Sequence, residues 1–218
     1  MRTLHAAPLV LPVGAPPVPD GAVLAEGDRL VAVGPQAELA EAYPTARIRE
    51  WPGVITPGLR QPRAGWLLRH CYFPDPREAE LLGTEPLPPT ETARLAPDAS
   101  RMGGSVRRGL QQMLRYGTTA VALPAGDPLL GAPVARLGMR VVPAADSEAD
   151  SGLPAGVPAL DPLAGVGSLA DAVHAPLVVG GPADFAVFDA GDEQALVARG
   201  AGTCVATVLG GRLLFRGR

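Results

Sequence analysis

The sequence predicts a mixed fold, with β structure at both ends of the chain and α/β structure between them. Residues 1–57 contain short apolar segments separated by turn residues, and residues 176–218 return to the same pattern. Between these ends, residues 99–144 read as a helix followed by a strand, a helix and a strand. We therefore expect a β domain from residues 1–57 and 176–218, and an α/β region with irregular loops from residues 58–175.

The N-terminal part predicts strands, a hairpin and a short helix. Gly27 lies where a tight turn needs a residue that tolerates positive φ, so we expect a hairpin around it. Pro35 suits the first turn of a helix over residues 36–43. Residues 51–59 read as a buried strand that leads into a turn. The other strands are expected at 3–11, 22–25, 29–33 and 46–51.

The strongest helix pattern lies over residues 99–116, where Val106, Leu110 and Met113 fall on one face. The segments after this helix predict a β-α-β unit, whose strands pair in parallel. The unit comprises a strand at 118–123, a weak helix at 128–137 and a strand at 139–144. Loops are expected at 74–97 and 146–168, a strand at 183–189, and a final hairpin around Gly210-Gly211.

Composition excludes several classes of protein. The chain has 218 residues, of which 47% are hydrophobic, and its formal net charge is −3. A packed core is expected, whereas nucleic-acid or membrane-surface binding is not. Cys71 and Cys204 form no CxxC pair, which favours a reduced, cytoplasmic protein. Pro8 and Pro12 interrupt the first apolar stretch, so neither a signal peptide nor a membrane-spanning helix is expected.

Several segments together resemble the amidohydrolase superfamily, in the branch that includes imidazolonepropionase and aminodeoxyfutalosine deaminase. In chain order they are DRLVAVGP at 28–35, WPGVITPGL at 51–59, LRYGTTAVA at 114–122, GGPADFAVFDA at 180–190 and VATVLGGRLLF at 205–215. The resemblance implies that both chain ends build one composite β-sandwich. Physics agrees, because neither end has enough strands to bury its own apolar face, and pairing the ends closes strand edges.

The resemblance also implies a metal-bearing (β/α)₈ barrel between the two halves of the sandwich, and here the chain departs from the family. Residues 58–175 give 118 positions (175 − 58 + 1), whereas such a barrel takes about 250 residues. We therefore expect a truncated, open and degenerate barrel remnant. Its exposed edge would be covered by loops, by a second copy of the chain or by another protein.

The metal site of the family also fails to match. The family binds zinc or iron through a His-x-His pair after the first barrel strand, and the matching positions here are Arg63 and Gly65. A guanidinium cannot lose its proton and become a ligand, so we expect no metal cofactor. The resemblance implies a hydrolase acting on carbon–nitrogen bonds other than peptide bonds. We expect this catalysis to be lost, and the sequence leaves open whether the chain is an enzyme.

Four residues are candidates for a different catalytic site. His70, Cys71 and Asp75 are close in sequence, and His174 could join them. They could form a substitute metal site or a cysteine nucleophile with its base. The alternative, which we favour, is a structural histidine beside a thiol that is buried as a small apolar group. In an extended chain, adjacent side chains such as those of His70 and Cys71 point to opposite faces.

Arg63 is the candidate ligand-binding residue, because an arginine can bind a carboxylate or a phosphate. Arg60 and Arg69 are near it in sequence. The alternative is that all three are surface residues. Two non-catalytic functions therefore remain, a partner subunit and a protein that binds a small anion or a nucleoside.

Other motifs are expected to be structural. The acidic segment 146–152 resembles half a calcium loop but lacks its glycine and glutamate, and residues 102–105 (MGGS) lack the lysine of a phosphate loop. Arg107 and Arg108 are expected on a solvated helix face. Asp184 and Cys204 are expected to support the β domain.

Overall fold

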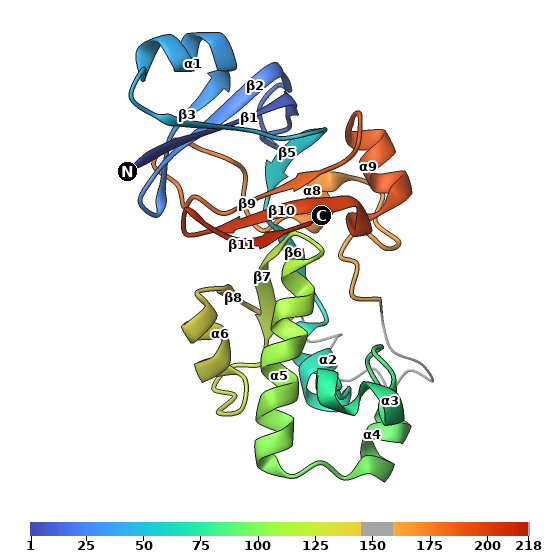
Figure 1. Cartoon of the computed structure of the whole chain (residues 1–218). Coiled ribbons are helices and arrows are strands. Elements are labelled where there is room, and N and C mark those ends of the chain that lie inside the picture. Colours follow the sequence, from blue (N-terminus) through green and yellow to red (C-terminus); the bar gives the residue numbers. More distant parts are fainter. Residues whose placement is uncertain (145–158, 218) are drawn as a thin grey trace. The chain divides into compact units, whose positions relative to one another are not determined.

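The computed structural model describes residues 1–144 and 159–217. The chain divides into two compact units. The terminal unit comprises residues 1–60, 114–119 and 161–218, and the middle unit comprises residues 61–113 and 120–160. The described residues contain one large sheet, one small sheet and several short helices, so the expected mixed α/β fold is confirmed (Figure 1).

The large sheet has eight strands, and they come from both ends of the chain. They are β1 (Arg2–Val10), β2 (Val18–Glu26), β3 (Arg29–Pro35), β4 (Arg47–Glu50), β5 (Val54–Pro57), β9 (Phe185–Phe188), β10 (Cys204–Leu209) and β11 (Arg212–Arg216). Their order is β11-β10-β9-β5-β1-β2-β3, and β4 pairs with β1. β5 runs antiparallel to β9, with Ile55 opposite Val187, and this pairing joins the two chain ends in one sheet.

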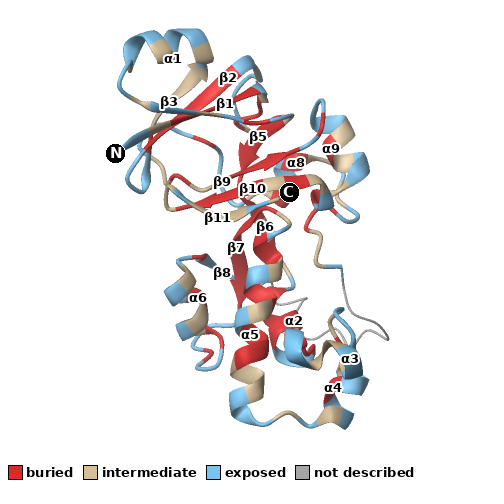
Figure 2. Cartoon of the chain, in the orientation of Figure 1, coloured by how far each residue is buried: buried red, intermediate tan, exposed pale blue. Residues whose placement is uncertain are grey.

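The central strands of this sheet are buried on both faces. Val54 and Ile55 are both fully buried but belong to different core clusters, because successive side chains of a strand point to opposite faces. Ile55 packs with Phe185, and Val54 packs with Phe188. Figure 2 shows this burial along β1, β5 and β9. The helices of this unit are α1 (Gln36–Ala42), α8 (Leu169–Ala172), α9 (Glu193–Arg199) and the 3₁₀ turn η2 (Ala201–Thr203).

The small sheet has three strands in the order β6 (Leu59–Gln61), β7 (Thr118–Leu123) and β8 (Arg140–Pro143). β7 and β8 pair in parallel, with Val121 opposite Val141, and α6 (Gly131–Leu137) lies between them in sequence. The expected β-α-β unit is therefore confirmed. β7 is buried along its whole length, whereas β8 exposes 53% of Val141.

The expected long helix is also confirmed as α5 (Ala99–Leu114), which buries Val106, Leu110 and Met113. Residues 74–97, expected to be a loop, instead contain the 3₁₀ turn η1 (Pro76–Glu78), α3 (Ala79–Leu82) and α4 (Pro89–Leu95). A capping box between Asp75 and Glu78 starts the first of these, and Pro89 occupies the first turn of α4. The prolines that suggested a loop therefore mark helix starts.

The segment after residue 59 also differs from expectation. Instead of a relaxed turn, the chain forms α2 (Ala64–His70), and the spacing of its buried Ala64, Leu67 and Leu68 is helical. The acidic motif at 146–152 lies outside the described residues. Within the described residues, no helix is both long and apolar enough to cross a membrane.

Candidate functional site

A cavity of about 210 Å³ lies in the middle unit, beside α2. Its lining residues come from α2, from the last part of β7, and from the segments that directly follow β6, β7 and β8. They are Pro62, Arg63, Gly65, Trp66, Arg69, His70, Ala122, Pro124 and Ala144. The cavity therefore lies at the carboxyl ends of the small-sheet strands, which is where open α/β sheets bind ligands.

One face of α2 supplies the polar and aromatic lining. Arg63 occupies the N-cap position, and Trp66 and His70 follow it at spacings of three and seven residues, which places all three on the same side of a helix. The rings of Trp66 and His70 contact each other, with centroids 5.5 Å apart and planes tilted by 45°. Arg63 is exposed, and no hydrogen bond or ion pair joins its guanidinium to another described residue.

Gly65 allows α2 to lie close to the end of β7. A Cβ added at Gly65 would lie 2.8 Å from Cδ of Pro124 and 3.3 Å from the carbonyl oxygen of Ala122. Contacts under 3.0 Å are sterically excluded, so no side chain fits at this position unless the helix or the proline moves. Glycine here is required by packing.

Arg69 is the second arginine of the cavity, but its charge is already paired. Its Nε and Nη2 both lie 2.6 Å from Oδ2 of Asp127. The Asp127 side chain is only 2% exposed, and its other oxygen accepts hydrogen bonds from the backbone N–H groups of Leu129 and Leu130. A buried carboxylate needs such partners, so Asp127 and Arg69 hold each other in place.

His70 and Cys71 lie in different environments. Partial burial, and then the positive charge of Arg69, lower the pKa of His70 below its usual range, so its imidazole is neutral at pH 7. Cys71 is completely buried, and burial raises the pKa of its thiol to about 12. A thiol with this pKa is a poor nucleophile.

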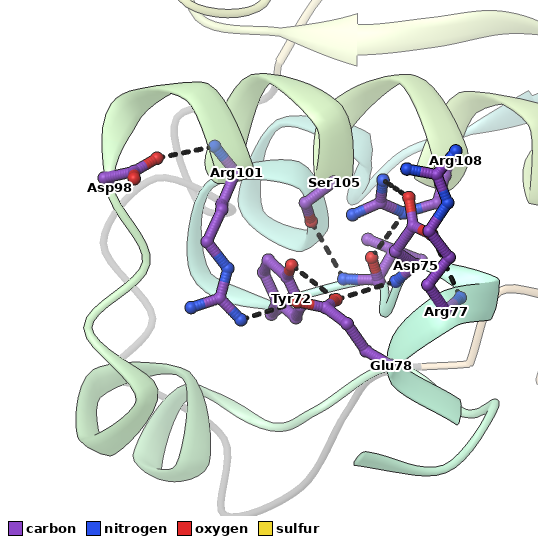
Figure 3. A network of polar contacts seen from close by, with 9 residues as sticks. Tyr72, Asp75, Arg77, Glu78, Asp98, Arg101, Ser105 and Arg108 are labelled. Atoms are coloured by element: carbon purple, nitrogen blue, oxygen red, sulfur yellow. Dashed lines mark hydrogen bonds and ion pairs between the residues drawn. The ribbon is translucent and has the colours of Figure 1, made fainter. Parts of the chain in front are cut away.

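Asp75 belongs to a network that fixes residues 72–78 on α5 (Figure 3). Arg108 donates from Nε to the carbonyl of Phe73 (2.8 Å) and from Nη1 to Oδ2 of Asp75 (3.2 Å). Ser105 accepts a hydrogen bond from the N–H of Phe73 at 2.8 Å. The expectation that Arg108 is solvated was wrong, because the segment it holds is a turn with carbonyl and carboxylate acceptors.

Glu78 is the central acceptor of the same network. Its carboxylate accepts hydrogen bonds from the N–H of Asp75 (2.9 Å), the hydroxyl of Tyr72 (2.7 Å) and Nη2 of Arg101 (2.6 Å). The backbone hydrogen bond from Asp75, then those from Tyr72 and Arg101, lower the pKa of Glu78 to about 2. Asp75 and Glu78 are therefore engaged in structure.

The remaining sequence candidates do not join the cavity. His174 is an exposed residue of the terminal unit, whereas His70, Cys71 and Asp75 belong to the middle unit. Arg60 is absent from the described lining. Asp184 accepts a hydrogen bond from the N–H of Gly210 at 2.7 Å, which is the structural role expected of it.

The zinc or iron that the resemblance implies does not fit the residues that the structure describes. A hydrolytic metal needs about three protein ligands, and no group of three or more histidine, cysteine, aspartate or glutamate side chains in the described part of the chain could hold an ion. At the two positions matching the His-x-His pair, Arg63 carries a permanent charge and Gly65 has no space for a side chain.

Sequence reasoning found Arg63 and Arg69 but missed Trp66, Pro124 and Asp127. The i, i+3, i+7 spacing of Arg63, Trp66 and His70 could have revealed the lining of α2, had a helix been expected there. The pairing of Asp127 with Arg69 joins residues 58 positions apart, and no local pattern predicts it.

The fold and site so far define a mixed α/β protein with a cavity at the edge of its small sheet. Residues 21–46 match a family model, the imidazolonepropionase-like composite domain of bacteria. These residues hold most of β2 and all of β3 and α1. The resemblance to the composite domain of the amidohydrolases is therefore confirmed.

Solved structures of amidohydrolase type are also similar to the chain. Ochratoxinase of A. niger is 23% identical over 65% of this chain and 30% of its own, with a TM-score of 0.44. An adenosine deaminase from Xanthomonas campestris with bound zinc is 22% identical over 64% of this chain and 33% of its own, with a TM-score of 0.42. Guanine deaminase from Bradyrhizobium japonicum is 19% identical over 65% of this chain and 34% of its own, with a TM-score of 0.43. The match spans about a third of each of these structures. No curated protein matches the sequence.

Proposed function

We propose that the chain is an amidohydrolase-like protein that binds a small anion. Its resemblance implies hydrolysis of carbon–nitrogen bonds, and in this proposal that activity is lost. In this proposal a composite β-sandwich built from both chain ends carries a truncated, degenerate barrel remnant. One observation carries the proposal: Arg63 lines the 210 Å³ cavity at a position where the resemblance places a metal-binding histidine.

The composition of the cavity supports an anionic ligand with a compact apolar body. Small-molecule sites are mostly apolar with a few polar groups that fix orientation. Here Arg63 offers planar N–H donors suited to a carboxylate, and Trp66, Pro62 and Pro124 supply apolar walls. The volume is below the roughly 300–1,000 Å³ typical of sites for drug-sized ligands, which favours a smaller molecule.

The loss of metal chemistry is supported by packing as well as by residue type. Replacing Gly65 by histidine would bring its Cβ to 2.8 Å from Pro124, so restoring the family's ligand pair would require α2 to move. In this chain α2 is instead held by the burial of Leu67 and Leu68.

Isothermal titration with a panel of carboxylates and inorganic phosphate at pH 7.5 tests the proposal. We expect saturable binding of at least one anion, a loss of about tenfold or more in affinity on Arg63→Gln, and no change on Arg107→Ala. Arg107 is an exposed residue of the same unit, so this control matches the change in charge.

The competing outcome is hydrolysis. Protein expressed with added zinc, iron and manganese would then hold about one equivalent of metal that a chelator removes, and it would release ammonia from amide or amidine substrates. That pair of results would overturn the proposal.

The exposed strand β8 favours a second candidate function, a subunit of a larger assembly. In the described residues β8 is an outer strand of the small sheet, and Val141 on it is half-exposed. Unpaired strand edges recruit other strands. Light scattering during gel filtration tests this function. Concentration-dependent dimerisation abolished by Val141→Lys would support it, and a monomer at all concentrations would restrict it to a different partner protein.

A further inference from the structure

The two arginines of the cavity differ in whether their charge is available to a ligand. Arg63 has no ion-pair partner among the described residues, whereas two nitrogens of Arg69 contact Oδ2 of Asp127 at 2.6 Å. His70, the other titratable lining residue, is neutral at pH 7. The cavity thus presents one available positive charge, although three basic side chains line it.

Asp127 cannot readily release Arg69 to a ligand. Its side chain is 2% exposed, and its Oδ1 is held by the N–H groups of Leu129 and Leu130. Freeing Arg69 would leave a buried carboxylate without its counter-charge, which is strongly unfavourable. A second negative charge on a ligand would therefore lie near this carboxylate without a cation to pair with.

We infer that the cavity selects singly charged anions over doubly charged ones, and that Asp127 sets this selectivity by engaging Arg69. The inference rests on the proposed anion-binding function and deepens it by assigning the charge of the ligand. Asp127 acts as a specificity-determining residue through Arg69. Asp127 is not among the described lining residues of the cavity, so the lining alone would not identify it.

Succinamate and succinate are suitable probes, because they have nearly the same shape and differ by one charge at pH 7.5. Isothermal titration of both ligands would use the wild-type protein, Asp127→Asn, and the double variant Arg69→Gln/Asp127→Asn. The asparagine keeps an oxygen for Leu129 and Leu130 but turns an amide group towards Arg69, which frees its charge. The double variant removes that charge and serves as the matched control.

We expect the wild type to bind succinamate more tightly than succinate. Asp127→Asn should improve succinate affinity by about tenfold, the effect of one added charge-assisted hydrogen-bond pair, with a smaller change for succinamate. The double variant should return to the wild-type preference. An unchanged ratio in Asp127→Asn would overturn the inference and leave anion binding in place.

Two further outcomes keep the test decisive. Circular dichroism and thermal unfolding establish whether Asp127→Asn folds. If it does not, the wild-type ratio decides, and equal affinity for the two ligands overturns the inference. If the wild type binds neither probe nor any anion of the wider panel, the proposed function itself fails, a result distinct from loss of selectivity.

Discussion

The terminal unit buries an uncharged polar pair within its sheet, whereas the middle unit fixes its short helices with charged groups. His5 is 2% exposed and accepts a 3.0 Å hydrogen bond from Nε1 of Trp51, with Phe185 packed edge-on at 4.8 Å. In the middle unit, Glu78 is still 24% exposed and contacts Arg101 at 2.6 Å. Apolar side chains are buried in both units, so the two units differ in their polar groups, and a fall in pH should affect them over different ranges.

The largest expected effect is from truncating the core of the terminal unit. Phe185 is completely buried between strands from both chain ends. Phe185→Ala should lower the free energy of unfolding by about 3–5 kcal/mol, through lost burial and the cavity left behind. Urea unfolding measures this. The control Leu81→Ala, at a side chain that is 89% exposed, should change stability by less than about 0.5 kcal/mol.

The second prediction concerns acid sensitivity of the terminal unit. Burial, and then the charge of Arg49, lower the pKa of His5 to about 4. Because the folded pKa lies below the unfolded value, the stabilisation is complete above pH 6.5 and is lost as pH falls towards 4. The loss should reach about 2–3 kcal/mol. In His5→Asn, which keeps an acceptor for Trp51, this slope between pH 6.5 and 4 should disappear from urea unfolding curves.

If the unfolding free energy of His5→Asn still falls between pH 6.5 and 4, groups other than His5 cause the acid sensitivity. The asparagine variant should also be less stable than the wild type at pH 7.5, because the ring contact with Phe185 is lost.

The third prediction concerns the acid sensitivity of the middle unit. The pKa of Glu78 is lowered to about 2, first by the backbone N–H of Asp75. Its stabilisation is therefore present above about pH 4.5, the ordinary value, and is lost as pH falls towards 2. We expect about 1–2 kcal/mol at pH 7, reduced by partial exposure. Glu78→Gln should remove it, whereas Glu80→Gln, at an exposed glutamate of α3, should not. Equal effects of the two variants in urea unfolding would contradict the network.

Regular patterns predicted much of the fold because local physics decides them. Two apolar segments separated by turn residues predicted the β2–β3 hairpin around Gly27, and apolar residues at helical spacing predicted α5. The helices α2, α3 and α4 were missed. Each is at most seven residues long, too short to show a clear period, and tertiary packing and caps stabilise them instead of intrinsic propensity.

The site could be predicted only in part, for a related reason. Arg63 was identified because a family motif marks its position. The paired state of Arg69 depends on Asp127, which a separate strand end brings near it, and such contacts leave no local signal in the sequence. The packing role of Gly65 likewise depends on Pro124.

Two glycine substitutions, one in each unit, test whether the two units unfold together. Gly27 in the terminal unit (φ 60°) and Gly83 in the middle unit (φ 75°) both have positive φ, and an added Cβ would meet no atom within 4 Å at either. Alanine should therefore cost only backbone strain at either position, about 1 kcal/mol at Gly27 and about 1–3 kcal/mol at Gly83, whose ψ of −170° places it in a region that only glycine readily adopts. Differential scanning calorimetry then reports cooperativity. If the units unfold independently, Gly27→Ala lowers one transition and Gly83→Ala the other, whereas a single transition lowered by both variants would mean that the two units unfold as one cooperative structure.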